Sequence, residues 1–247
     1  MIKKIEISAG LNNLGTIIPH PSIFYFFITK GRVGAIRETM KISLHQLSKY
    51  YEHSYESYFM NGKGLSLLGK IQGISQEFLY FLVRSFKPRV VVETGVYRGI
   101  SSALILGALR DNNRGKLYSI DLPQTKYTSE SGIVDFSPLS GRERTGFAIP
   151  EDLKSRWELV LGDSKIELPK LLDKLGTVDM FYHDSEHTYS MMTWEYETVF
   201  PFLADNSILS SDDVNWNLAF QDFCAMHKIV PNIVAERGGY SIINSKR

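Results

Sequence analysis

The feature that most constrains this chain is a regular alternation of strand and helix patterns that begins after Pro88. Short apolar runs alternate with longer segments in which apolar residues recur every third or fourth position, as on one face of a helix. We expect strands at 90–93, 116–121, 157–163, 178–184 and 207–213, and helices at 101–110, 164–175, 188–203 and 217–228. Two further runs, 232–236 and 240–244, are joined across glycines and predict a hairpin. The pattern predicts an α/β fold with a doubly wound, mostly parallel sheet of seven strands and an antiparallel edge hairpin.

The chain divides near Lys87 and Pro88 into two expected domains. Residues 1–86 form an aromatic-rich, largely helical extension, and residues 87–247 carry the alternating pattern. Within the second domain, residues 122–150 are rich in turn residues and lack a periodic pattern. Because this segment leaves the carboxyl end of the second strand, where doubly wound sheets bind ligands, we expect it to form a lid.

The turn between the first strand and its helix reads Glu93-Thr-Gly95-Val-Tyr-Arg-Gly99. It lacks the Gly-x-Gly-x-x-Gly spacing of dinucleotide-binding proteins, and the chain contains no Gly-Lys-Ser or Gly-Lys-Thr of a phosphate-binding loop. A carboxylate at this turn would repel a pyrophosphate but suits a ligand that carries a positive charge. Asp121 closes the second strand, where an acidic residue accepts hydrogen bonds from ribose hydroxyls. A ribose together with a cation describes S-adenosylmethionine, which we predict as the cofactor.

Acidic residues also end the strands at 178–184 and 207–213. Because these strands are expected to be neighbours, Asp184, Asp212 and Asp213 should converge in one crevice. Three such carboxylates repel one another, and a hard divalent cation, with Mg²⁺ the first choice, would relieve that repulsion. The alternative is that Asp212 or Asp213 caps the helix that follows.

His187 is the candidate general base, because it follows Asp184 at the start of a helix and a hydroxyl acceptor is a poor nucleophile until it is deprotonated. Asp184 is assigned to catalysis with it. His183 is the second candidate, but it lies inside an apolar strand, where a structural role is favoured. Glu186 is either a further metal ligand or a residue that favours the helix N-terminus.

Five stretches taken together resemble class I S-adenosylmethionine-dependent methyltransferases. The resemblance is to the branch of macrocin-type sugar O-methyltransferases and cephalosporin-hydroxylase-like proteins, methyltransferase family 24. The stretches are VVETGVYRGISS, LYSIDLP, GFAIPEDLKSRWELVLGDS, DMFYHDSEHTYSMM and LSSDDVNWNLAF.

The resemblance implies a Rossmann-like methyltransferase fold and metal-dependent O-methylation, with acidic metal ligands at the strand ends. It also implies a cofactor site around the first turn, with Asp121 on the ribose and Asp163 and Ser164 beside the adenine. The residues expected at that site are Glu93, Gly95, Tyr97, Gly99, Ser101, Asp121, Asp163 and Ser164.

We therefore predict an enzyme that transfers the methyl group of S-adenosylmethionine to a hydroxyl of a small molecule, such as a sugar or natural product, with Mg²⁺ as a second cofactor. One alternative is a protein of this fold that binds the cofactor without transferring methyl groups. Another is a nicotinamide oxidoreductase, which Glu93 and the glycine spacing disfavour. A net charge of +1 and the lack of a flipped-base motif argue against a nucleic-acid partner.

The single cysteine, Cys224, excludes a disulfide within this sequence and fits a reducing compartment, so we expect a cytoplasmic protein. The most apolar early run, IFYFFI at 23–28, is far shorter than the roughly 20 residues that a membrane helix needs. We therefore expect no integral membrane contact. Residues 1–86 are expected to complete the acceptor pocket or to form a homo-oligomer contact.

Overall fold

A mixed sheet of seven strands runs through the part of the chain that the computed structural model describes, residues 78–80, 82–122, 144–234 and 237–244. Its strand order is β3-β2-β1-β4-β5-β7-β6. The strands are β1 (Val90–Thr94), β2 (Lys116–Asp121), β3 (Trp157–Leu161), β4 (Val178–His183), β5 (Leu203–Ser211), β6 (Asn232–Val234) and β7 (Gly238–Ile243). The first five strands pair in parallel, whereas β7 is antiparallel to both β5 and β6. The predicted doubly wound α/β fold with an antiparallel edge hairpin is confirmed.

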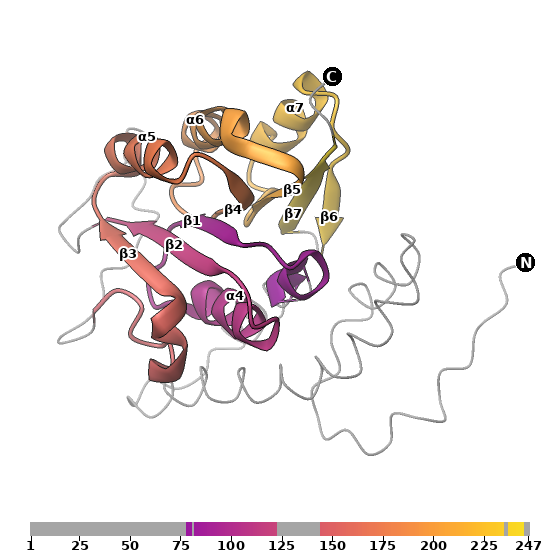
Figure 1. The fold of residues 1–247 in the computed structure, drawn as a ribbon. Coiled ribbons are helices and arrows are strands. Elements are labelled where there is room, and N and C mark those ends of the chain that lie inside the picture. Colours follow the sequence, from indigo (N-terminus) through magenta and orange to yellow (C-terminus); the bar gives the residue numbers. More distant parts are fainter. Residues whose placement is uncertain (1–77, 81, 123–143, 235–236, 245–247) are drawn as a thin grey trace, which may run out of the picture.

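Helices cover both faces of this sheet (Figure 1). On one face lie α5 (Ser164–Leu175), α6 (Tyr189–Val199) and α7 (Ala219–Met226), and on the other lies α4 (Ile100–Asp111). Two short 3-10 turns, η1 (Glu151–Arg156) and η2 (Phe200–Phe202), precede β3 and β5.

The alternation of side chains along the strands produces two separate hydrophobic cores. Val91 packs in the core that contains Leu106 of α4, whereas the next residue, Val92, packs in the core that contains Leu168 and Met192. Successive residues of a strand point to opposite faces, so a strand buried on both faces is apolar throughout. The valine run of β1 therefore places this strand in the middle of the sheet.

The end of the predicted amino-terminal extension packs against the sheet. Residues 78–80 and 82–86 are helical, and Phe78, Leu79 and Leu82 are buried in the same core as α4. The rest of the predicted extension, 1–86, and the greater part of the predicted lid, 122–150, lie outside the described residues.

The helix predicted at 188–203 is shorter in the structure. It ends at Val199, and the chain passes through η2 before β5 begins at Leu203. Pro201 explains the difference, because a proline has no N–H to donate to the helical hydrogen-bond pattern, although Phe200 before it keeps helical backbone angles. Pro169, by contrast, lies within α5 without dividing it.

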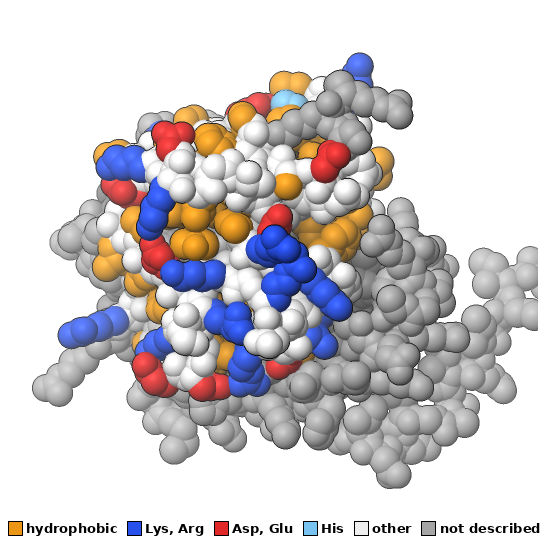
Figure 2. Space-filling model, viewed as in Figure 1, with side chains coloured by type: hydrophobic (Ala, Val, Ile, Leu, Met, Phe, Trp, Pro, Cys, Tyr) orange, Lys and Arg blue, Asp and Glu red, His pale blue; other side chains and the backbone are white. Residues whose placement is uncertain are grey.

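The visible surface mixes charge and apolar side chains. On the face shown in Figure 2, Lys and Arg side chains lie among acidic and hydrophobic ones. Of the helices in the described ranges, none is both long enough and apolar enough to cross a bilayer.

Candidate functional site

The carboxyl ends of the central parallel strands meet at one edge of the sheet. Hydrogen bonds continue just beyond the strands, from the Asp184 N–H to the Thr94 carbonyl at 2.8 Å and from the Asp212 N–H to the His183 carbonyl at 2.8 Å. The two acidic residues are therefore neighbours at this edge. This is the edge at which doubly wound sheets bind ligands.

The glycine turn after β1 packs closely against its surroundings. Gly95 has φ +83°, and a Cβ at this position would lie 1.9 Å from the Asp184 carbonyl oxygen. Gly99, at φ +90°, begins α4, and a Cβ there would lie 2.7 Å from Cγ1 of Ile149. A side chain at either position would be strained and would collide with its neighbours.

Glu93 lies beneath this turn and is completely buried. Its carboxyl accepts hydrogen bonds from the hydroxyls of Ser101 at 2.7 Å, Ser102 at 2.6 Å and Ser119 at 2.7 Å. Burial raises the pKa of Glu93 to about 7, although the three hydroxyls act in the opposite direction. In this arrangement Glu93 links β1, α4 and β2 through these three hydroxyls.

Asp121 lies at the end of β2 beside the turn, where the sequence places it. One carboxylate oxygen accepts the N–H of Val96 at 3.0 Å and the other accepts the Thr145 hydroxyl at 3.0 Å. Burial raises the pKa of Asp121. A ribose hydroxyl can take the place that the Thr145 hydroxyl occupies, so the donor chemistry of this end of the sheet fits S-adenosylmethionine.

The other residues predicted around the cofactor have local structural roles. Asp163 is the N-cap of α5 and accepts the N–H of Lys165 at 2.9 Å. Tyr97 has φ 50°, a left-handed conformation that is rare for a residue with a side chain and often marks a functional turn. Ser164 is buried at the start of α5. Their contacts with a cofactor stay predictions.

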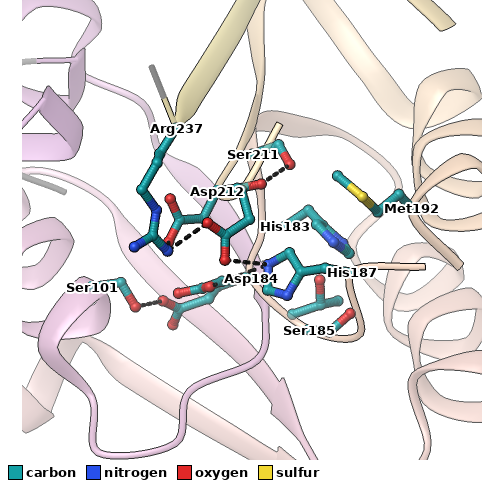
Figure 3. A network of polar contacts seen from close by, with 12 residues as sticks. Ser101, His183, Asp184, Ser185, His187, Met192, Ser211, Asp212 and Arg237 are labelled. Carbon is teal, nitrogen blue, oxygen red and sulfur yellow. Dashed lines mark hydrogen bonds and ion pairs between the residues drawn. The ribbon is translucent and has the colours of Figure 1, made fainter. Parts of the chain in front are cut away.

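Asp184, Asp212 and Arg237 lie together in Figure 3. Asp213 joins them through its ion pair with Arg237, so the three carboxylates converge as predicted. The Arg237 guanidinium lies 2.5 Å from a carboxylate oxygen of Asp213 and 3.5 Å from one of Asp212. Burial, followed by the charges of Asp212, Glu93 and Asp213, raises the pKa of Asp184 well above its usual range. The pKa of Asp213 is raised by burial and by Asp212, against the opposing effect of His187 and Arg237.

Arg237, which follows β6 and immediately precedes β7, brings one positive charge to this cluster through its ion pairs with Asp213 and Asp212. Within the described ranges, no group of three or more His, Cys, Asp or Glu side chains is arranged to hold a metal ion. The three oxygen donors suit Mg²⁺ chemically, but their geometry with Arg237 in place does not fit a metal centre.

His187 lies at the same cluster. Its Nε2 is 3.7 Å from a carboxylate oxygen of Asp184 and 3.8 Å from one of Asp213. Its side chain is only 8% exposed, and its ring lies 5.3 Å from the ring of Trp216. Because two carboxylates face this nitrogen, a proton gained there is stabilised electrostatically.

His183 belongs to a buried network behind His187. Its Nδ1 is 2.6 Å from a carboxylate oxygen of Glu195, which also accepts the Thr94 hydroxyl at 2.5 Å. Ser185 donates its hydroxyl to the other oxygen at 2.9 Å. Burial opposes the charge on Glu195, but the neighbouring His183 lowers the pKa of Glu195 overall. The rings of His183 and His187 meet edge to face at 5.3 Å, so the network supports His187 from behind.

Sequence reasoning missed Arg237, Glu195 and Trp216. Glu195 had a detectable signal, because it lies on the buried stripe of α6 with Met192 and Val199, where a carboxylate needs a partner. Arg237 had none, because no local pattern shows that the start of β7 lies beside the end of β5.

A family model described as a methyltransferase domain matches residues 92–214. Among solved structures, the chain is similar to the calicheamicin methyltransferase CalS11 at 20% identity, covering 72% of this chain and 80% of that one with a TM-score of 0.52. The O-methyltransferase NovP shares 16% identity over 71% of this chain and 80% of its own, with a TM-score of 0.53. The SAH-bound methyltransferase PaMTH1 of Podospora anserina shares 17% identity over 94% and 100%, with a TM-score of 0.50. No curated protein sequence matches the chain.

Proposed function

Residues 92–214 belong to this methyltransferase domain family, so the chain is an S-adenosylmethionine-dependent methyltransferase of class I, and we propose that it methylates a hydroxyl of a small molecule. The observation that carries the proposal is the extent of the family match. It runs from β1 to just beyond β5 and includes the glycine turn, Asp121, His187 and the acidic strand ends. The names of NovP, an O-methyltransferase, and CalS11, a calicheamicin methyltransferase, support the acceptor class.

The chemistry asks little of the protein beyond positioning and removal of one proton. S-adenosylmethionine supplies a methyl group on a positively charged sulfur, and attack by a hydroxyl oxygen forms the new C–O bond while the C–S electron pair stays on sulfur. His187 takes the hydroxyl proton at Nε2. Asp184 and Asp213 stabilise the imidazolium that results, because both lie within 4 Å of that nitrogen. Asp121, at the end of β2 beside the glycine turn, holds the nucleoside end.

A divalent cation at Asp184, Asp212 and Asp213 is a separate proposal. Three carboxylates at adjacent strand ends support it, since such oxygens are the ligands that Mg²⁺ prefers. Any cation that binds there has to displace the guanidinium of Arg237 from Asp212 and Asp213. In the present arrangement, two of the three proposed ligands, Asp212 and Asp213, are therefore engaged in ion pairs with Arg237.

Isothermal titration tests the cofactor. We expect S-adenosylmethionine and its demethylated product to bind, and NAD not to bind. Asp121→Ala should weaken binding of both nucleosides by about 1.5–3 kcal/mol, the scale for lost hydrogen bonds to a charged group. Asp205→Ala is the matched control, because Asp205 is an exposed carboxylate near the opposite end of β5. Binding of NAD at micromolar concentration without heat from S-adenosylmethionine would overturn the proposed function.

Manganese titration tests the cation without any acceptor. If Arg237 competes with a metal, the Arg237→Gln variant should bind Mn²⁺ more tightly than the wild-type protein. The Asp212→Asn variant should not bind Mn²⁺. The readout is the electron paramagnetic resonance signal of free Mn²⁺. If neither variant changes this signal, the proposed cation site is contradicted. Proton transfer is then assigned to His187, Asp184 and Asp213 without a metal.

A further inference from the structure

The loop between β5 and α7 carries large apolar side chains that face solvent beside the site. Trp216 is 56% exposed and Leu218 is 63% exposed. The most exposed of the large aromatic side chains in the described ranges is Trp216. Apolar surface of this size gains nothing from contact with water, so its position next to His187 calls for an explanation.

The loop is held in place by hydrogen bonds at several points. The Trp216 N–H donates to the Asp213 carbonyl at 3.0 Å, which closes a turn. The Asn217 amide donates to the His187 carbonyl at 3.0 Å and contacts the sulfur of Met192 at 3.3 Å. The Asn217 side-chain oxygen accepts the N–H of Ala219, the first residue of α7, at 2.8 Å. Trp216 is therefore a side chain on an anchored loop.

The ring of Trp216 is oriented toward the candidate base. Its centroid lies 5.3 Å from that of His187, and the two ring planes are inclined by 50°. Trp216 is therefore in contact with the imidazole while more than half of the residue stays exposed to solvent. A molecule that lies on the open part of Trp216 would lie beside the imidazole of His187, whose side chain is only 8% exposed. An indole surface suits the flat apolar face of an aromatic ring or a pyranose, because both bring C–H or π surface to it.

We propose that Trp216 is the platform on which a ring of the methyl acceptor stacks, so that a hydroxyl on that ring faces His187. The acceptor is then a hydroxylated ring compound, either a pyranose or a phenol, rather than an open-chain alcohol. The inference rests on the proposed function and specifies its acceptor. Asn217 is a positioning residue, since it joins the platform to the backbone of His187.

The experiment measures ring binding to the complex of the full chain with S-adenosylhomocysteine. The probes are methyl α-glucopyranoside, methyl α-rhamnopyranoside and catechol, with glycerol as the acyclic control, followed by saturation-transfer NMR and by tryptophan fluorescence. At least one ring probe should bind and glycerol should not. Trp216→Ala should raise the dissociation constant of that probe at least about tenfold, and Trp216→Phe, which keeps an aromatic face, by less than about threefold.

Leu218→Ala is the matched control, because it removes a neighbouring exposed apolar side chain and leaves the indole in place. It should leave ring binding unchanged, and all three variants should bind S-adenosylhomocysteine as the wild-type protein does. Equal ring affinity in wild-type and Trp216→Ala protein, or a wild-type complex that binds none of the ring probes, would overturn the inference. Failure to bind S-adenosylhomocysteine at all would instead overturn the proposed function, so the two failures are distinguishable.

Discussion

Single residues at this site differ in what balances their charge. The acidic pair Asp212 and Asp213 faces the guanidinium of Arg237, Glu195 faces the imidazole of His183, and the side-chain hydrogen bonds to Glu93 come from neutral hydroxyls. Hydroxyl donors offset the burial of a carboxylate less well than a cation does. We therefore expect the ionisation of Glu93 to have a direct effect on the free energy of unfolding.

Glu93→Gln should change how stability depends on pH. Below the ordinary pKa of 4.5 the carboxyl is protonated in both the folded and the unfolded protein, and above about 7 it is ionised in both. Between these values only the unfolded chain has released the proton, so rising pH favours unfolding. Over this window the Glu93 contribution to the free energy of unfolding should fall by about 3 kcal/mol, and the glutamine variant should lack that fall.

Denaturant unfolding from pH 4 to 8 measures this effect as the difference between wild-type and variant protein. The difference reports Glu93 together with its electrostatic coupling to Asp184, because the charge of Glu93 helps to raise the pKa of Asp184. Burial raises the pKa of Asp121 and Asp213 in both proteins, so that contribution is shared. Glu158→Gln is a control of opposite sign, since the neighbouring Lys116 lowers the pKa of Glu158. Parallel stability curves for wild-type and Glu93→Gln protein would contradict the prediction.

We expect replacement of His187 to affect catalysis and replacement of His183 to affect stability. His187→Ala should slow transfer to a ring acceptor by roughly 10²–10⁴-fold with little loss of stability. His183→Ala should instead destabilise the protein by about 1–3 kcal/mol, because the buried Glu195 loses its imidazole partner and keeps only hydroxyl donors. Turnover and thermal unfolding of both variants check the pair. A stability loss in His187→Ala as large as that in His183→Ala would assign both residues a structural role.

Among the elements, the turn between β1 and α4 depends most on close backbone approach. Gly95 brings the end of β1 against the carbonyl of Asp184 after β4, and this contact sets the distance between the glycine turn and the acidic cluster. The neighbouring loop after β5 is tied to the loop of His187 by Asn217. The site is therefore built from loops that are joined to one another as well as to the sheet.

Gly95→Ala should cost far more than a glycine replacement with the same backbone strain. Gly176, the C-cap of α5, also has a positive φ of +71°, but nothing lies within 4 Å of a Cβ built there. We expect a loss of about 1 kcal/mol for Gly176→Ala and of about 3 kcal/mol or more for Gly95→Ala, which adds a backbone collision to the strain. Chemical denaturation measures both. Equal losses would show that the turn relaxes away from Asp184 without cost.

For the whole molecule, the two cores on either face of one sheet make a single structural unit of the described residues. The core on the α6 and α7 face contains the only cysteine of the sequence, Cys224, which is completely buried. Burial raises the pKa of its thiol to about 12. A thiol reacts as its thiolate. Cys224 should therefore resist thiol reagents, both because little thiolate forms at neutral pH and because the side chain is buried.

Cys224 should therefore report on opening of the molecule as a whole. Native protein should not react with Ellman's reagent, and denatured protein should react with one equivalent. Addition of S-adenosylhomocysteine should slow the residual reaction, since a ligand that binds only the folded state lowers the open population. Rapid labelling of native protein, at the rate seen in denaturant, would show that α7 opens independently of the rest.

The amino-acid sequence by itself determined the order of strands and helices, the parallel sheet, the positions of Asp184 and Asp212 at strand ends and that of His187 just before the next helix. These follow from hydrophobic periodicity and turn residues, which act over short distances along the chain. Only the tertiary structure decided that Glu93 points into the interior and that Arg237 forms ion pairs with Asp212 and Asp213. Trp216, likewise, is placed beside His187 only by the fold. Such contacts depend on which strands and loops are neighbours in space, and long-range pairing of this kind leaves no local pattern in the sequence from which it could be predicted.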